Sequence, residues 1–274
     1  MASGDTQPTQ PLPGWSYSEP APKRRRSAWP WIVAILVVIG LAVAAWFAGE
    51  AIARDIVTKT IREQVITQLQ LPADQDIDVV VEGAVLPQLI VGTLDEVTIA
   101  SDDVTLGALV GDVTVHAQDI AIRGDDAAAG AASATIVLDA EELRALVSTI
   151  EDFPAATVGL AEPDVTVETE LSLFGIRVPV AVALTPSAVE GDIVLTPTSL
   201  QLAGNEVSAD ALRDRFGGVA DAVLRDWTIC IAEYIPAGVE LSSIAVTGDQ
   251  VVADIAIDGA IVSDLTLQEP GVCE

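Results

Sequence analysis

An uninterrupted apolar stretch over residues 28–48 constrains this chain more than any other feature of its sequence. As a helix it rises about 32 Å, enough to cross a hydrocarbon core of about 30 Å. Trp29 and Trp31 lie near one end and Trp46 near the other, at the depth that amphipathic rings prefer. Because apolar side chains surround the stretch on all faces rather than on one stripe, we predict a transmembrane helix.

The basic run at 23–26 sets the expected orientation of this helix. Cations beside a span stay on the cytoplasmic side, so we expect residues 1–27 in the cytoplasm and 49–274 outside. The first 27 residues are rich in proline and small polar residues, which is typical of a disordered tail. A cleaved signal peptide is the alternative, with a weak small-x-small site at 51–53, although its apolar region is usually shorter. We therefore predict a single-pass plasma-membrane protein.

The part of the chain beyond the membrane is strongly acidic. The whole chain carries a net charge of −28 and the tail +2, which leaves −30 for the remainder, where Lys59 is the only lysine. Such a domain repels nucleic acid and offers no polybasic surface to anionic lipid, so we expect no nucleic-acid partner. The acidity suits a soluble extracytoplasmic face. Adventitious calcium at Asp102 and Asp103 or at Asp125 and Asp126 is the alternative, but the EF-hand loop pattern is absent and we predict no metal site.

Cys230 and Cys273 are the only cysteines in the chain. In an extracytoplasmic domain, two cysteines predict one disulfide, provided that their Cα atoms come within about 7 Å. This bond would connect the C-terminus to the segment around Trp227. A structural role is favoured over a redox role because the chain has no C-x-x-C motif.

Helical spacing follows the membrane stretch directly. Apolar residues recur at four- or five-residue steps within 50–71, at Ile52, Ile56, Ile61, Val65 and Leu69. Pro72 predicts the end of this helix. We expect the helix to continue from the membrane and to pack its apolar stripe against the domain.

From Asp76 onward the apolar period changes to two, which is typical of strands. Short alternating runs between 77 and 122, separated by turn signals, predict an antiparallel meander. A strand over 135–138 leads into a short helix, with Asp139 as the N-cap and Glu142 in a capping-box position. The second half predicts strands within 165–171, 176–184, 193–202, 229–234, 239–247 and 251–257, and a helix over 209–224 interrupted at Gly217 and Gly218. The fold class is therefore α+β with an antiparallel sheet.

Catalytic motifs are missing from the sequence. His116 is the only histidine, so neither a two-histidine metal site nor several copies of a Ser-His-Asp triad can form. No G-x-S-x-G, P-loop or G-x-G-x-x-G pattern occurs. We expect a protein without enzymatic activity and without a cofactor.

An aliphatic composition is the most informative remaining feature, because half of the chain is hydrophobic but only 4% is aromatic. Such an interior suits either an ordinary β-rich core or a smooth cavity for acyl chains. Residues 84–92 lie between predicted strands yet are apolar, where a loop is usually polar. Two interpretations stay open, a loop folded under the sheet and a lip that faces the membrane. The apolar side chains concerned are Leu86, Pro87, Leu89, Ile90 and Val91.

The chain carries VEG at 81–83, LPQLIVGTLDEV at 86–97 and DVTLG at 103–107, and later CIAEYIPAGV at 230–239 and VTGD at 246–249. These segments resemble the actinobacterial LmeA-like phospholipid-binding family, and the resemblance extends over about 52–261. It implies a cell-envelope protein that binds phospholipid, including phosphatidylinositol. It also implies an elongated, twisted antiparallel sheet wrapped around helices, similar to tubular lipid-binding proteins. The loop at 86–91 and Phe174 would then lie near the lipid opening.

Two functional hypotheses follow. The first is a membrane-anchored extracytoplasmic protein that holds the acyl chains of a phospholipid in an aliphatic cavity. The second is a structural or scaffolding envelope module, without catalysis, that binds a basic protein partner through its acidic face. Loss of lipid entry in a Leu89→Asp variant with an intact fold is expected under the first hypothesis only.

Overall fold

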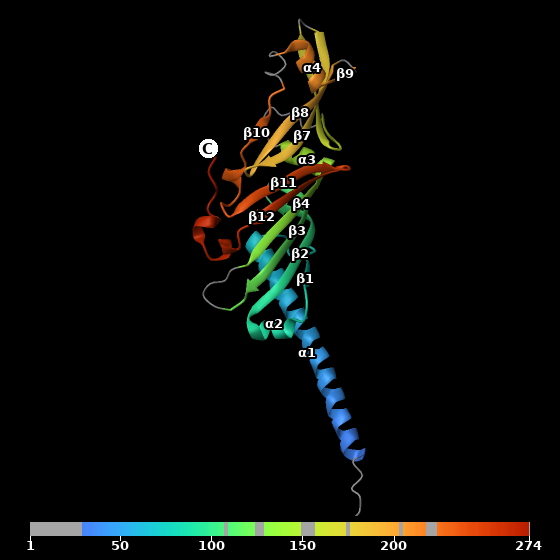
Figure 1. The fold of residues 1–274 in the computed structure, drawn as a ribbon, viewed down its shortest axis with the longest axis vertical. Coiled ribbons are helices and arrows are strands. Elements are labelled where there is room, and N and C mark those ends of the chain that lie inside the picture. Colours follow the sequence, from blue (N-terminus) through green and yellow to red (C-terminus); the bar gives the residue numbers. More distant parts are fainter. Residues whose placement is uncertain are drawn as a thin grey trace, which may run out of the picture. The chain divides into compact units, whose positions relative to one another are not determined.

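A computed structural model describes residues 29–106, 109–123, 129–148, 157–173, 176–202, 205–217 and 224–273 (Figure 1). The chain divides into two compact units, Met1–Trp46 and Phe47–Glu274. The predicted disordered tail at 1–27 lies outside the described residues. All the strands described below belong to the second unit.

Helix α1 (Trp29–Leu69) is 41 residues long. Within the described part of the chain, it is the one helix long and apolar enough to cross a membrane. The predicted membrane helix and the predicted helix over 50–71 are therefore one continuous element. It ends slightly earlier than expected, because Gln70 has a positive φ of 54° ahead of Pro72.

The face of α1 that packs against the domain differs in part from the predicted stripe. Ala53 is buried in the main core. Four other residues of α1 are partly buried and pack against this core, namely Val57, Ile61, Val65 and Ile66. The predicted members Ile52, Ile56 and Leu69 are instead exposed. The five-residue step from Ile56 to Ile61 turns about 140° around the helix axis, so the predicted series joined two different faces.

The first sheet contains six antiparallel strands in the order β1-β2-β3-β4-β12-β11. The pairing of β4 with β12 brings together strands that are far apart in sequence (Figure 1). The predicted runs around 97 and 104 are one long strand with a bulge between Ser101 and Val104, where Asp103 has a positive φ of 52°. The strand bounds are β1 (Asp78–Val81), β2 (Thr93–Leu106), β3 (Leu109–Ala121), β4 (Ala131–Asp139), β11 (Val239–Thr247) and β12 (Gln250–Ile257).

The second sheet is also antiparallel, in the order β10-β8-β7-β6-β5, and β9 pairs with β8. The predicted α+β class with an N-terminal apolar helix is confirmed, and its strands form two sheets. The predicted strand over 229–234 is wrong in its second half, because Ala232–Tyr234 is a 3₁₀ turn (η2). The strand bounds are β5 (Val158–Ala161), β6 (Asp164–Leu173), β7 (Ile176–Val189), β8 (Asp192–Leu202), β9 (Asn205–Ser208) and β10 (Trp227–Ile229).

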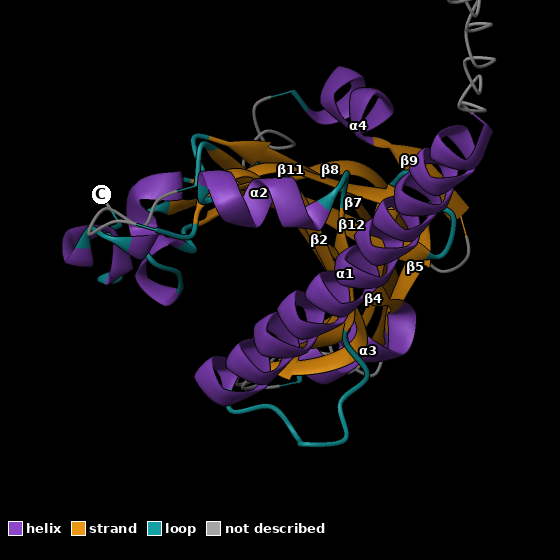
Figure 2. Cartoon of the chain, turned by 90° about the horizontal axis from the view of Figure 1, so that it is seen from below, coloured by secondary structure: helices purple, strands orange, loops and turns teal. Residues whose placement is uncertain are grey.

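Helices are few beside the strands (Figure 2). The predicted capping box is present in α3 (Ala140–Val147), where the Asp139 carboxylate accepts from the Glu141 and Glu142 amides and the Glu142 carboxylate accepts from Asp139 N. α4 (Ala209–Phe216) ends at Gly217, and most of its predicted continuation, at 218–223, lies outside the described residues. The remaining elements are α2 (Val85–Val91), η3 (Gly259–Val262) and η4 (Leu265–Gln268).

Candidate functional site

The apolar segment between β1 and β2 is a helix, so the predicted loop is wrong in its secondary structure. α2 (Val85–Val91) starts after Ala84, and Gly92 is its C-cap. Gly92 has a left-handed φ of 94°, and its amide donates a hydrogen bond to Gln88 O at 2.7 Å. Pro87 falls in the first turn, where a missing N–H costs little. The local sequence is therefore compatible with a short helix.

α2 has one packed side and one exposed end. Val85 and Gln88 are buried, while Leu86 and Leu89 are half-buried and pack against the core of the first sheet. At the C-terminal end, Ile90 is 73% exposed and Val91 75%. The segment therefore packs one side against the core, while its last two side chains are exposed. A lip that faces the membrane stays a prediction.

A carboxylate of α1 caps the N-terminus of α2. Glu50 accepts hydrogen bonds from the amides of Val85 at 2.6 Å and Leu86 at 3.0 Å, whereas Ala84 provides no side-chain cap. These amide donors, that of Leu86 first, lower the pKa of Glu50, and the adjacent Arg54 guanidinium acts in the same direction. Glu50 therefore connects the start of α2 directly to α1.

Arg54 extends this connection to the end of β1. Its Nη2 lies 3.4 Å from the Glu50 carboxylate, and its guanidinium donates to Val81 O and to Gly83 O. We call Glu50 and Arg54 the α1 clamp. It engages both the strand that precedes α2 and the first turn of α2.

The C-terminal half of α2 is held by two other side chains. Buried Gln88 donates to Glu82 O at 2.8 Å and accepts from Asp95 N at 3.1 Å. Arg123 Nη1 donates to Ile90 O at 3.1 Å. Since both ends of α2 have partners outside the helix, Ile90 and Val91 are presented in a defined position.

Sequence reasoning did not identify Glu50, Arg54, Gln88 or Arg123. One usable signal was the lack of a capping side chain at Ala84, which implies that a cap for α2 comes from elsewhere. The sequence gives no way to choose Glu50 from the many carboxylates, since it lies 35 residues from Val85.

The second sheet has an aliphatic face. Its register sets Val165 opposite Leu184, and Val167 opposite Val182, which in turn faces Leu200. Directly paired residues share a face of the sheet. The other face carries small and polar pairs such as Glu168 with Ala181. The sheet is therefore amphipathic across its central strands.

This aliphatic face is incompletely buried. Val180 and Leu184 are buried, but Val165, Val167 and Val182 are only half-buried. α3 contributes Leu143 and Leu146, and α4 contributes Leu212, to small clusters that include residues of this face. Val165 also packs against the cluster of Leu138, Val246 and Val251 from the first sheet. Apolar area thus remains accessible at Val167 and Val182.

Two hollows lie near the start of β11 rather than on the aliphatic face. They have volumes of about 230 and about 330 Å³ and share Glu240 in their lining. Sites for drug-sized ligands usually measure about 300–1,000 Å³, and a diacyl lipid is larger still. Neither hollow is the predicted aliphatic cavity, which stays a prediction. Phe174, the remaining predicted lipid residue, lies outside the described residues.

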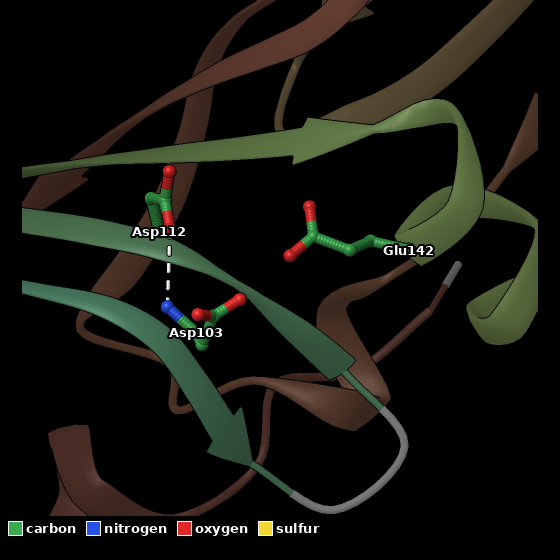
Figure 3. A group of neighbouring side chains, drawn as sticks. All are labelled: Asp103, Asp112 and Glu142. Atoms are coloured by element: carbon green, nitrogen blue, oxygen red, sulfur yellow. Dashed lines mark hydrogen bonds between the residues drawn. The ribbon is translucent and has the colours of Figure 1, made fainter. Parts of the chain in front are cut away.

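Three carboxylates gather beside the bulge of β2. The ligand atoms of Asp103, Asp112 and Glu142 lie within 4.8 Å of one another (Figure 3). Two of them already have structural partners, because Asp112 accepts from Asp103 N and Glu142 caps α3. Of the two pairs considered for calcium, Asp103 belongs to this group, whereas Asp125 and Asp126 lie outside the described residues. We assign no metal to the group.

The predicted disulfide is present in the structure. Cys230 and Cys273 are bonded, with their Cα atoms 5.9 Å apart. Cys230 directly follows β10, so the bond fastens the C-terminal segment to the edge of the second sheet. The Gly271 amide adds a hydrogen bond to Ile235 O.

His116 has an ordinary strand environment. Its Nδ1 lies 3.0 Å from Thr98 Oγ1 on the neighbouring strand, and the two residues are directly paired. This contact is a cross-strand hydrogen bond of the kind expected for a solitary histidine in a sheet.

A family model described as LmeA-like phospholipid-binding matches residues 44–256. Comparison with curated proteins and with solved structures found no match. The matched region includes the α1 clamp, α2 and every strand of the second sheet. It covers most of the chain, which therefore belongs to the LmeA-like phospholipid-binding family.

Proposed function

We propose that this protein is a membrane-anchored, extracytoplasmic phospholipid-binding protein of the cell envelope. α1 supplies the anchor, α2 forms a lip at the membrane surface, and acyl chains occupy an aliphatic cavity along the second sheet. Membership of a phospholipid-binding family supports the ligand class. The observation that carries the proposal is the fixed α2 with its exposed apolar end.

The clamp supports a position for α2 close to the bilayer. Glu50 is two residues beyond the predicted end of the membrane stretch at Ala48, which is a rise of about 3 Å. Its carboxylate bonds the first turn of α2. The first turn of α2 therefore lies close to the proposed bilayer boundary.

The chemistry of the lip suits that location. Apolar residues of an interfacial helix enter the acyl boundary to a depth of about 5–10 Å, and Ile90 and Val91 are the exposed apolar pair that can do so. Leu86, Pro87 and Leu89 are half-buried and form the inner side of the lip. Leu86 and Leu89 join the lip to the core of the first sheet.

The second sheet supplies the surface for acyl chains. Withdrawing one methylene from water is favourable by about 0.8 kcal/mol. Exposing the roughly thirty methylenes of a diacyl lipid to water would therefore cost about 24 kcal/mol, so the protein must shield them. Half-buried Val165, Val167 and Val182 on one face offer aliphatic contact without polar groups. Such a ligand gives these side chains the burial that the protein alone leaves incomplete.

Binding of a basic protein partner is the second candidate. The hollow rimmed by Glu190, Asp192 and Glu240 is the described surface that favours it. This interaction would weaken steeply with salt and would not require lipid.

Phospholipid loading of the full-length protein tests the proposal. The protein is purified in detergent and incubated with phosphatidylinositol-containing mixed micelles, and phospholipid retained after gel filtration is measured by mass spectrometry. We expect Val91→Asp to slow loading strongly, because it places a charge at the apolar entrance. Leu89→Asp is unsuitable for this purpose, since Leu89 packs against the core.

Val262→Asp is the matched control, because Val262 is an exposed valine of η3. It should load like the wild type, and the anchor, which is the same in each protein, contributes equally to the background. Equal loading of all three proteins would remove α2 from the site. A wild type that retains no phospholipid above the level of a variant with the second sheet disrupted would reject the function itself.

A further inference from the structure

Arg123 lies beside the exposed end of α2, two residues after the end of β3. It donates to Ile90 O through Nη1, and its side chain runs along Gly92, where a Cβ atom would come within 3.1 Å of Arg123 Cδ. The preceding residue, Ile122, is exposed and bonds Gly92 O through its amide at 2.9 Å. Ile90, Val91, Ile122 and Arg123 therefore form a small surface, which we call the lip patch.

The lip patch combines exposed apolar side chains with a cation in a domain that is otherwise strongly acidic. Several other described cations have different partners. Arg62 donates to Ile77 O, Arg144 to Val158 O, and Lys59 pairs with Asp55. Among the described residues, Arg123 is the cation that borders the exposed end of α2, and its side chain is itself exposed.

We propose that Arg123 binds the phosphate of a phospholipid headgroup while Ile90 and Val91 enter the acyl boundary. This inference rests on the proposed function and adds a headgroup contact to the same lip. The occupant is the phospholipid of the bilayer to which α1 anchors the chain.

The geometry of the guanidinium fits this role. One amino group of Arg123 is used by Ile90 O, and the remaining N–H donors of the planar fork can meet phosphate oxygens. Arginine packs its stem along apolar surface and keeps its charge at headgroup level. The bond to Ile90 O fixes that charge next to the apolar pair, so headgroup and acyl contacts occur together.

Charge complementarity favours phosphate at this position. An arginine–phosphate pair is a charge-assisted and often bidentate contact, stronger than a bond between neutral groups. The contact depends on the phosphate and not on the net charge of the lipid. It should therefore form with zwitterionic as well as anionic phospholipid.

Photolabelling of the full-length protein in nanodiscs tests the inference. The discs contain phosphatidylcholine with a diazirine near the glycerol, and adducts on the peptide with Ile90 and Val91 are quantified. Arg123→Gln should reduce these adducts about fivefold, the upper range for one solvent-exposed ion pair, and Arg123→Lys less. Arg225→Gln, which removes an exposed arginine outside the lip patch, should label like the wild type.

A second set of discs separates phosphate binding from support of α2. In discs of a diacyl glycolipid without phosphate, carrying the same diazirine, wild type and Arg123→Gln should label equally. An equal loss in both disc types would mean that Arg123 only supports α2, and unchanged labelling of Arg123→Gln in phosphatidylcholine would also overturn the inference. If the wild type is labelled and Arg123→Gln is labelled equally, only the role of Arg123 is rejected. If the wild type is not labelled, the proposed lip function is rejected as well.

Discussion

The two sheets of the domain carry similar aliphatic strands but bury them to different degrees. The largest fully buried side chains among the described residues, Ile77, Val81 and Val85, all belong to the core beside α1. On the aliphatic face of the second sheet, Val167 and Val182 stay half-buried. Among the described residues, the most deeply buried side chains thus lie beside the first sheet, and Val167 and Val182 of the second sheet keep accessible area.

The difference has a physical origin in the helices available to each sheet. α1 contributes Ala53, Val57, Ile61 and Val65 to the first core at successive turns. α3 and α4, with eight residues each, are too short to cover the second sheet in the same way. An unfilled aliphatic face costs free energy in water, and an apolar ligand can recover it.

A matched pair of isoleucine truncations should give the largest contrast. Ile77→Ala removes a fully buried side chain from the first core and should lower the free energy of unfolding by about 2–5 kcal/mol. Ile193→Ala, at a half-buried position of β8, should cost only about 1 kcal/mol. Chemical unfolding of the full-length protein in detergent measures both, and equal losses would contradict the difference in packing.

The disulfide offers the next largest effect, and it joins the end of β10, at the edge of the second sheet, to the C-terminal segment. It closes a loop with a sequence separation of 43, so Cys230→Ala combined with Cys273→Ala should destabilise the protein by about 2–4 kcal/mol. Amide exchange should rise in β10 and β8, which are paired, and stay unchanged in β1 and β2. A general rise in both sheets would show that the two regions unfold together.

Removal of the clamp charge should act locally on α2. Glu50→Gln weakens the bonds to the Val85 and Leu86 amides, so these two amides should exchange faster while the strands of the first sheet keep their protection. Asp55→Asn is the control, since Asp55 lies on the same helix and pairs only with exposed Lys59. If both variants exchange alike, Glu50 does not hold α2.

Acid should release α2 through the same carboxylate. The pKa of Glu50 is lowered below its ordinary value of 4.5, first by the Leu86 amide, so the ionised carboxylate favours the folded state. Its contribution is complete above about pH 4.5 and is lost as the pH falls through the lower folded pKa. Exchange of the Val85 and Leu86 amides, corrected for intrinsic rates, should rise only below pH 4.5. The Glu50→Gln variant should lack this transition.

Periodicity made the regular elements predictable from the sequence. The continuous apolar stretch predicts the first part of α1, and the period of two predicts most strands, because both patterns are local. The capping box at Asp139 and Glu142 was equally local and is present. Local sequence could not decide whether the face of α1 with Ile52 or the face with Ala53 packs against the domain. Both positions continue a series of apolar residues at four-residue steps.

The candidate site was only partly predictable. Its apolar residues were recognisable because Ile90 and Val91 are unusual between strands. The two ends of α2 are hydrogen-bonded by Glu50 and Arg123, which lie far from it in sequence. The division into two sheets depends on the pairing of β4 with β12, which no local pattern contains. Contacts between residues that are distant in sequence therefore determine these two features, which local sequence patterns do not predict.

Mapping of acyl-chain contacts tests the central claim most directly. The full-length protein in nanodiscs is photolabelled with a phospholipid that carries a diazirine at the middle of an acyl chain, and adducts are located by peptide mass spectrometry. The account predicts adducts in β6, β7 and β8, at the aliphatic face around Val167 and Val182, and none in β1 around Val81. Adducts found only within the apolar stretch at 29–46 would contradict it.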